Sequence, residues 1–194
     1  WDAKAKLAKI SISQNQKLSA DVLLFNFPLT VRFKSKAGTA DRHITVKEKS
    51  EDFYFPLAEA PEVVRVDPQL TVLAKIKFNV PDAMLHAQLA DAEDVIGRVL
   101  AITQLAQKKD HTTVAKLKQT LKTDRFYGVR IEAAQALRAI HTEEALAALT
   151  DSLDQPDARV RQQVVAAVAG FYQHNAHDVA RRVLEREKNP EIVS

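Results

Sequence analysis

The chain has 194 residues, with 28 Lys and Arg against 25 Asp and Glu, a formal net charge of +3, and no Cys. The lack of Cys excludes disulfides, thiolate nucleophiles and Cys-ligated zinc or iron. No apolar run approaches the length of a membrane-spanning helix and no signal-peptide pattern opens the chain, so we expect a soluble protein with no membrane segment. These features leave the compartment unknown, and the bacterial cytoplasm is one candidate.

The composition changes partway along the chain. Residues 1–80 hold four of the seven Pro and short alternating apolar runs, whereas the remainder is rich in Ala, Leu, Gln and Arg at helical spacing. This change predicts two domains, residues 1–80 and 81–194. We expect their boundary between Ile76 and Asp82, with a short connection and close packing between the domains.

The first domain is predicted to form a series of short strands. Apolar residues alternate in residues 6–16, where Ala8, Ile10 and Ile12 share a face, and in residues 22–33, where Phe25 to Phe33 do so at every second position. Further alternating runs predict strands at residues 42–46, 53–57, 64–66 and 76–80. Six or seven short strands of this kind predict an antiparallel, immunoglobulin-like β-sandwich.

Two residues of this domain indicate where a strand is interrupted or turns. Pro28 lacks a backbone N–H, so we expect its strand to lie at an edge or to be broken by a bulge. Gly38, within residues 36–39 (KAGT), predicts a hairpin turn, because Gly adopts a positive φ without strain.

The second domain repeats at one spacing, from Arg98 to Arg130 and again, one position shorter, from Arg130 to Arg161. Leu117 and Leu121 are followed by Leu149 and Leu153 at the longer of these two spacings. Helix pairs that repeat in this way predict an α-solenoid. A short helix is expected from Asp82, followed by one capped by Asp91 that carries on one stripe Val95, Val99, Ile102 and Ala106.

The segments 124–130 (DRFYGVR) and 156–161 (PDARVR) each open an Ala-rich helix and resemble short HEAT-like repeats. In such repeats Asp and Arg usually form a ladder between neighbours, so the resemblance implies a structural role for Arg98, Arg130 and Arg161. The predicted fold is therefore an α+β chain of two domains, an N-terminal antiparallel β-sandwich followed by an all-α superhelical HEAT-like array.

A search for chemistry finds no H-E-x-x-H, G-x-S-x-G, phosphate-loop or EF-hand pattern. His174, His177 and Asp178 could ligate a metal, but we interpret them as turn and cap residues between two helices. Asp91, Glu93 and Asp94 gather three carboxylates where a helix begins, which favours capping. We therefore assign no catalytic, cofactor-binding or metal-binding residue to this chain.

The basic excess lies in residues 1–80, with 13 Lys and Arg against 9 Asp and Glu. Most of these lysines alternate with apolar residues, as solvent-facing strand positions do. Basic residues interleaved with exposed aromatic ones, as nucleic-acid surfaces require, are not visible, so we expect no nucleic-acid partner.

The order of several segments resembles the region that follows the catalytic domain in the aminopeptidase N family of zinc metallopeptidases, including relatives with HEAT-like repeats. The resemblance rests on residues 1–2 (WD), 7–16 (LAKISISQNQ), 25–29 (FNFPL), 53–57 (FYFPL), 66–68 (VDP), 88–94 (QLADAED), 97–98 (GR), 121–130 (LKTDRFYGVR) and 133–134 (AA).

The resemblance implies a non-catalytic C-terminal part of a zinc aminopeptidase, which supports and gates an active site upstream of this chain. The zinc ligands and the catalytic Glu would lie upstream, so zinc would belong to the parent and not to this chain. The implied partners are the upstream catalytic domain of the same polypeptide and the peptide substrate of the parent.

The alternative is an interaction scaffold from a catalytically inactive relative, because some members of that family serve as assembly subunits, one of them in transcription initiation. Residues 189–194 (NPEIVS) echo the opening of the preceding repeat, so we expect a further repeat to begin there. Its truncation predicts an apolar face open to self-association.

Overall fold

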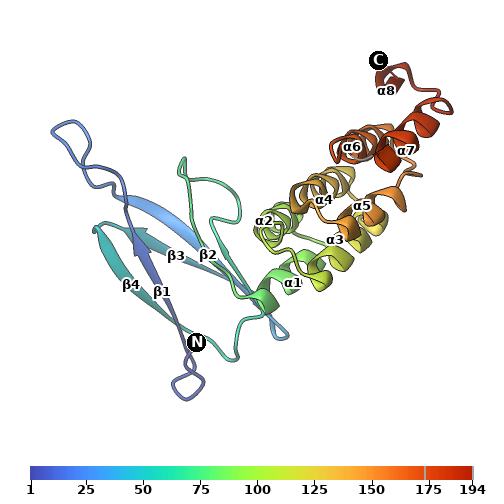
Figure 1. Cartoon of the computed structure of the whole chain (residues 1–194). Helices are drawn as coiled ribbons and strands as arrows, with labels where there is room; N and C mark the ends of the chain where they lie inside the picture. The colour runs from blue at the N-terminus through green and yellow to red at the C-terminus, as the bar shows by residue number, and fades with distance from the viewer. Residues whose placement is uncertain (173, 194) are drawn as a thin grey trace. The chain divides into compact units, whose positions relative to one another are not determined.

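The computed structural model describes residues 1–172 and 174–193 (Figure 1). The chain forms two compact units, Trp1–Gln88 and Leu89–Ser194. The first unit contains all the described strands and most of the first helix, and the second contains the remaining helices. The finer expectations, domains at residues 1–80 and 81–194 in close contact, stay predictions.

The first unit contains two small antiparallel sheets. Strands β1 and β4 form one, and β3, β2 and β5 lie in that order in the other. The tight connection after β2 contains Gly38, whose φ of 124° confirms the predicted hairpin turn. The strands span Leu7–Ser13 (β1), Phe27–Ser35 (β2), Gly38–Val46 (β3), Ser50–Pro56 (β4) and Val63–Val66 (β5).

The two sheets share one apolar core. Ala8 of β1 and Phe55 of β4 pack with Phe33 of β2 and Val64 of β5, and the rings of Phe33 and Phe55 lie 5.1 Å apart. Alternation along each strand explains this, because every second side chain points to the same face. The predicted antiparallel sandwich is thus confirmed.

The position of Pro28 corrects the prediction of an edge strand. β2 is the central strand of its sheet, but β5 pairs with it only from Val31 to Lys34. Pro28 lies outside that stretch and faces Thr45 of β3 alone. Pro28 therefore lacks its backbone N–H at a point where β2 pairs with one strand only. A β-ladder tolerates a missing donor at such a position.

Two predicted strand segments are wrong. Residues 22–26 precede β2 and form no strand, and Phe25 is exposed. The buried side chain of Gln14 replaces the ladder there, because its oxygen accepts from Phe25 N–H and its nitrogen donates to the Phe25 and Glu48 carbonyls. Alternating apolar residues thus predicted a strand where one amide side chain holds an extended loop.

Residues 76–80 likewise form no strand, so the first unit has five described strands and not six or seven. The preceding loop is held by Asp67, which is 1% exposed and has a φ of 47°. Its carboxylate accepts hydrogen bonds from the N–H and hydroxyl of Thr71 and from the N–H of Val72. Burial alone would raise the pKa of Asp67, but these bonds together lower it.

Substitution of Asp67 should therefore destabilise the first unit. Asp67→Ala removes three hydrogen bonds to a buried carboxylate and places Ala at a positive φ, so we expect a loss of about 3 kcal/mol in unfolding free energy. Asp67→Asn, which keeps the shape and tolerates that φ, should cost less. Chemical denaturation of both variants checks this, and equal losses would contradict it.

The helices of the second unit follow a fixed register. The helices α2, α4, α6 and α8 begin at Val95, Tyr127, Ala158 and Pro190, and the intervening α3, α5 and α7 begin at His111, Glu143 and His174. The spacing predicted from the sequence is therefore the spacing of the structure. The helices span Asp82–Ala90 (α1), Val95–Leu105 (α2), His111–Thr123 (α3), Tyr127–Ile140 (α4), Glu143–Thr150 (α5), Ala158–Ala169 (α6), His174–Leu184 (α7) and Pro190–Val193 (α8).

Within the second unit, α2, α4 and α6 stack as one layer and α3 and α5 as a second (Figure 1). The core between them is aliphatic and fully buried, and includes Leu105, Leu117, Leu137 and Leu149. Each helix needs its neighbours because its apolar stripe has no other cover. A HEAT-like array is therefore what these residues build.

The start of α2 differs from the prediction in its cap. Asp94, and not Asp91, is the N-cap, and its carboxylate accepts from the N–H of Gly97 at 2.7 Å. Asp91 lies shortly before it and accepts from the N–H of Glu93. Three acidic residues lie close together before α2, and a negative charge on Asp91 or on Asp94 would suit the helix dipole. The hydrogen bond from the first turn of the helix identifies Asp94 as the N-cap.

Candidate protein-interaction surface

The three repeated arginines share one structural role. Each guanidinium donates to a backbone carbonyl in the loop that precedes its own helix, Arg98 to Asp91 at 2.7 Å, Arg130 to Asp124 at 2.7 Å and Arg161 to Gln155 at 2.9 Å. These carbonyls lie outside the helices, so the arginine gives them a partner. The structural interpretation of the three arginines is supported by this geometry.

Two of the arginines also pair with an acid of the next repeat. Arg98 is 2% exposed and its Nε lies 2.8 Å from the carboxylate of Asp124. Arg161 binds Glu187 through two nitrogens, at 2.8 and 3.1 Å. The acid stands 26 residues after the arginine in both pairs. Together they form the inter-repeat ladder that the sequence predicted.

The middle step of this ladder is neutral. Asp124 and Glu187 each stand at the third position before the next first-layer helix, and Gln155 is the residue at that position before α6. Gln155 is buried, and neither its Oε1 nor the buried Nε of Arg130 has a hydrogen-bond partner among the described residues. A carboxylate is therefore replaced by an amide at the joint between α4 and α6.

Gln155→Glu should stabilise the second unit. The added charge stands at the register position of an acid and within the buried joint that holds Arg130, so we expect a gain of about 1 kcal/mol in unfolding free energy. In an Arg130→Met background the gain should be smaller, because one cation of this joint is lost while Arg161, which donates to the Gln155 carbonyl at 2.9 Å, remains. A double-mutant cycle by chemical denaturation measures both, and a cycle with no coupling would refute this pairing.

The pair at the last step predicts a pH dependence. Arg161, followed by the N–H of Asn189, lowers the pKa of Glu187 from 4.5 to about 2. Because the folded pKa lies below the unfolded value, the pair contributes stability above about pH 4.5 and loses it as the pH falls towards 2. Glu187→Gln should therefore destabilise at pH 7 and become nearly neutral near pH 2. Thermal unfolding of both proteins between these values tests it, with a pH-independent difference as the contrary result.

The exposed face of the first helix layer changes from repeat to repeat. Thr103, Gln135 and Ala166 occupy equivalent positions on α2, α4 and α6, and all three are exposed. Inward positions of the same helices are small and apolar, as Ala101 and Ala133 illustrate. Packing thus constrains the inward positions and leaves the outward ones free to differ.

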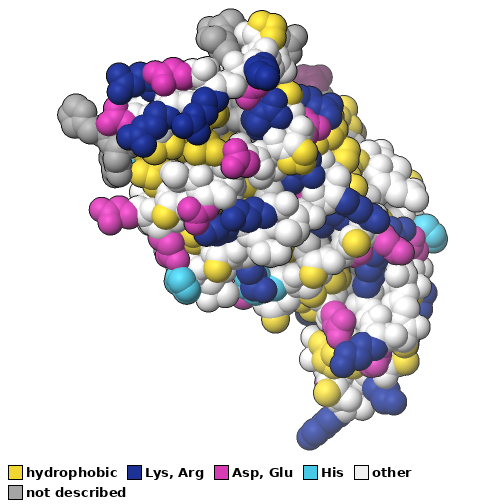
Figure 2. All heavy atoms as spheres, turned by 90° about the vertical axis from the view of Figure 1, so that its right-hand side faces the viewer, with side chains coloured by type: hydrophobic (Ala, Val, Ile, Leu, Met, Phe, Trp, Pro, Cys, Tyr) yellow, Lys and Arg dark blue, Asp and Glu magenta, His cyan; other side chains and the backbone are white. Residues whose placement is uncertain are grey.

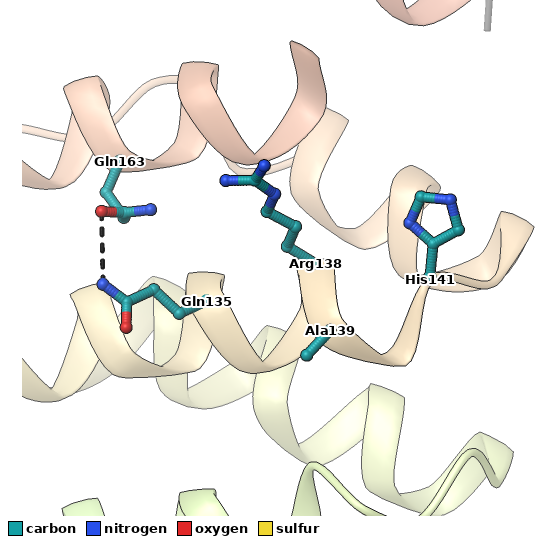
Figure 3. A pocket seen from close by; sticks show the side chains of 5 residues that line it. All are labelled: Gln135, Arg138, Ala139, His141 and Gln163. Atoms are coloured by element: carbon teal, nitrogen blue, oxygen red, sulfur yellow. Dashed lines mark hydrogen bonds between the residues drawn. The ribbon is translucent and has the colours of Figure 1, made fainter. Parts of the chain in front are cut away.

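A groove of about 510 Å³ lies on this layer, between α4 and α6. It is lined by Gln135, Arg138, Ala139, His141 and Gln163 (Figure 3). The amide nitrogen of Gln135 donates to Gln163 at 3.4 Å, across the two helices. Four of the five lining residues have polar side chains, and they include an arginine and no carboxylate.

The two other polar groups of the groove have defined supports. Arg138 extends from the last turn of α4 towards α6 (Figure 3) and lies over Gly170, where an added Cβ would be 2.5 Å from its Nε. His141 ends α4 in the left-handed conformation, and its ring stacks on Phe171 at 4.4 Å. Gly170 therefore makes room for the guanidinium, and Phe171 orients the imidazole.

The His-rich segment is helical and not a turn. His174 opens α7, which corrects the interpretation of this stretch as a connection between helices. The side chain of His174 lies outside the described residues, whereas His177 is exposed and Asp178 pairs with Arg181 at 3.2 Å. Among the side chains that the structure describes, which do not include that of His174, no three His, Asp or Glu are grouped to hold a metal ion.

Charge is mixed over the visible surface. Figure 2 shows a face on which Asp and Glu side chains lie among the Lys and Arg. In the first unit Lys9 pairs with Asp52, and Arg32 pairs with Asp41 through two nitrogens. The absence of a nucleic-acid partner stays a prediction. Among the described helices, none combines the length and the apolar character needed to cross a membrane.

Comparison with known proteins agrees with the helical architecture. Residues 83–169 match the family model described as HEAT repeats. A similar curated protein is "Transcription initiation factor TFIID subunit 2" of Drosophila melanogaster, which is 22% identical over 169 residues, covering 72% of this chain and 14% of that protein. The chain thus spans about one seventh of the length of this relative. The helical region over residues 83–169 thus has HEAT repeats, while the relation to zinc aminopeptidases stays a hypothesis.

Sequence reasoning identified the ladder and missed the groove. The arginines of the ladder recur at a fixed spacing, whereas Arg138 does not, since Ala106 and Ala169 stand at its equivalent positions. The presence of Arg138 at a position where the other repeats have Ala is the sequence signal that could have indicated the groove. A charged residue that interrupts a repeat of small ones has no part in the repeated packing.

Proposed function

We propose that the second unit is a protein-interaction scaffold whose exposed face, formed by α2, α4 and α6, binds a partner protein. The match of residues 83–169 to HEAT repeats carries this proposal, because stacked helix pairs present an extended surface of this kind. The name of the Drosophila relative, a subunit of a transcription initiation factor, also fits a role in an assembly.

The variation along this face supports the same function. The ladder and the aliphatic core occupy the inward positions. At one equivalent position near the helix start, α2 has the apolar Ile96, α4 has Gly128 and α6 has the charged Arg159. Ile96 of α2 and the neighbouring Leu100 are 40% and 39% exposed. Such a surface offers different chemistry at successive repeats, which specific recognition requires.

The finer hypothesis is that the chain supports and gates a zinc aminopeptidase active site located upstream. It rests on the order of the segments that resemble that family, and the sandwich would then act as a spacer. An H-E-x-x-H motif with a downstream Glu in the part of the gene before Trp1, together with peptidase activity of the encoded protein, would support it. Their absence would leave the catalytically inactive scaffold.

Cross-linking from the two helix layers tests the scaffold. A photoreactive residue at Thr103, Gln135 or Ala166 should cross-link a partner protein in cells of the source organism, because these three positions lie on the exposed face of the first layer.

The matched controls are Ala115 and Ala147, which are also exposed but lie on α3 and α5 of the other layer. The same protein should be captured from at least two first-layer positions and from neither control. Capture from both layers alike, or from neither layer, would contradict the proposal.

A further inference from the structure

We propose that the groove between α4 and α6 binds an extended segment of the partner protein through an Asp or Glu side chain, with Arg138 as the group that pairs with the carboxylate. This inference rests on the proposed scaffold function and specifies the partner chemistry of one part of that surface. The residues that carry it are Arg138, Gln135, Gln163 and Gly170.

The first argument is that Arg138 is not required by the repeat. Ala106 and Ala169 stand at the same position at the ends of α2 and α6, so packing between repeats does not need a long cation there. Gly170 leaves open the space that the guanidinium occupies, since a Cβ at that position would lie 2.5 Å from its Nε and the guanidinium would have to shift. The lack of a side chain at Gly170 leaves space for the guanidinium at the groove, beside the end of α6.

The second argument is charge. The residues lining the groove include Arg138 and His141 but no Asp or Glu, and no described residue forms an ion pair with Arg138. The contrast is with Arg159 of the same layer, whose guanidinium is already held by Asp157 and lies 3.4 Å from the centre of the Tyr127 ring. An exposed guanidinium that has no ion-pair partner among the described residues favours a carboxylate partner, which it can bind through two nitrogens.

The third argument concerns the rest of the segment. Gln135 and Gln163 approach each other across the groove at 3.4 Å, a weak hydrogen bond that an entering chain can replace. Each amide can donate to and accept from a peptide backbone. Two such amides beside an Arg suit an extended chain, whose backbone groups are free, better than a helix, whose groups are already paired.

Selection of displayed peptides on the full chain provides the probe. Random heptapeptides on phage are selected against the protein, and a synthetic peptide of the most enriched sequence is titrated by calorimetry. We expect an enriched Asp or Glu, and replacement of that residue by Asn or Gln should weaken binding about tenfold, the effect of one partly desolvated charge pair.

Variants of the protein assign the effect to Arg138. Arg138→Gln should weaken binding of the acidic peptide about tenfold and leave binding of its amide version unchanged, whereas Arg138→Lys should retain part of the affinity. Lys116→Gln, which removes an exposed charge from α3, controls for net charge and should have no effect. Circular dichroism of each variant confirms that the helices remain folded.

The outcomes separate this inference from the scaffold function. Acidic peptides that bind Arg138→Gln as well as the unaltered protein, or enriched peptides without Asp or Glu, would overturn the acidic groove, while cross-linking from Thr103 and Ala166 would still support the scaffold. A phosphoserine version that binds far more tightly than the Glu version would replace the carboxylate by a phosphate and likewise overturn it. Loss of both peptide binding and cross-linking would remove the scaffold as well.

Discussion

The second unit depends on one interaction, the contact of the arginines near the starts of α2, α4 and α6 with the loop before their own helix, which Arg98 and Arg161 extend to an acid before the next first-layer helix. The carbonyls it satisfies lie just before helix starts, and the acids it pairs with lie 26 residues further along. A guanidinium can reach both only if successive helices begin at a nearly constant interval. The starts of α2, α4, α6 and α8 at Val95, Tyr127, Ala158 and Pro190 meet this constraint. The aliphatic core then fills the space that the ladder defines.

This constraint divides the residues of each helix by role. Inward positions repeat, because the same neighbours surround them in every repeat. Outward positions do not repeat, and there the chain carries Arg138 with its matching Gly170, and Gln135 facing Gln163. The joint between α4 and α6 is also where the ladder is neutral, since Gln155 stands at the position of an acid. The groove and the uncharged step thus occur at the same joint, between α4 and α6.

How far sequence reasoning reached depends on whether a feature is periodic. Arg98, Arg130 and Arg161 revealed the helical array because they recur, and the hairpin at Gly38 followed from a property of one residue. The loops after β1 and β5 were assigned as strands because alternation reports extended backbone and not its hydrogen-bond partners. After β1 the partner of the Phe25 backbone is the side chain of Gln14, and after β5 Asp67 holds Thr71 and Val72, just before the misassigned residues 76–80; no pattern of apolar residues reveals either interaction. The role of Arg138 was missed for a related reason, because it depends on contacts with α6 and on the difference between Arg138 and the residues at the same position in the other repeats.

The two units also differ in how far along the chain their contacts reach. Arg98 and Asp124 are 26 residues apart, so each repeat can form soon after the one before it. In the first unit Ser11 of β1 meets Asp52 of β4, 41 residues away, and the chain between these two strands contains β2 and β3, which pair in the other sheet. Folding slows as the mean separation of contacting residues grows, because a longer loop must be ordered before any contact rewards it. The helical array can therefore assemble by addition of neighbours, whereas pairing of β1 with β4 requires closure of the longer loop that contains β2 and β3.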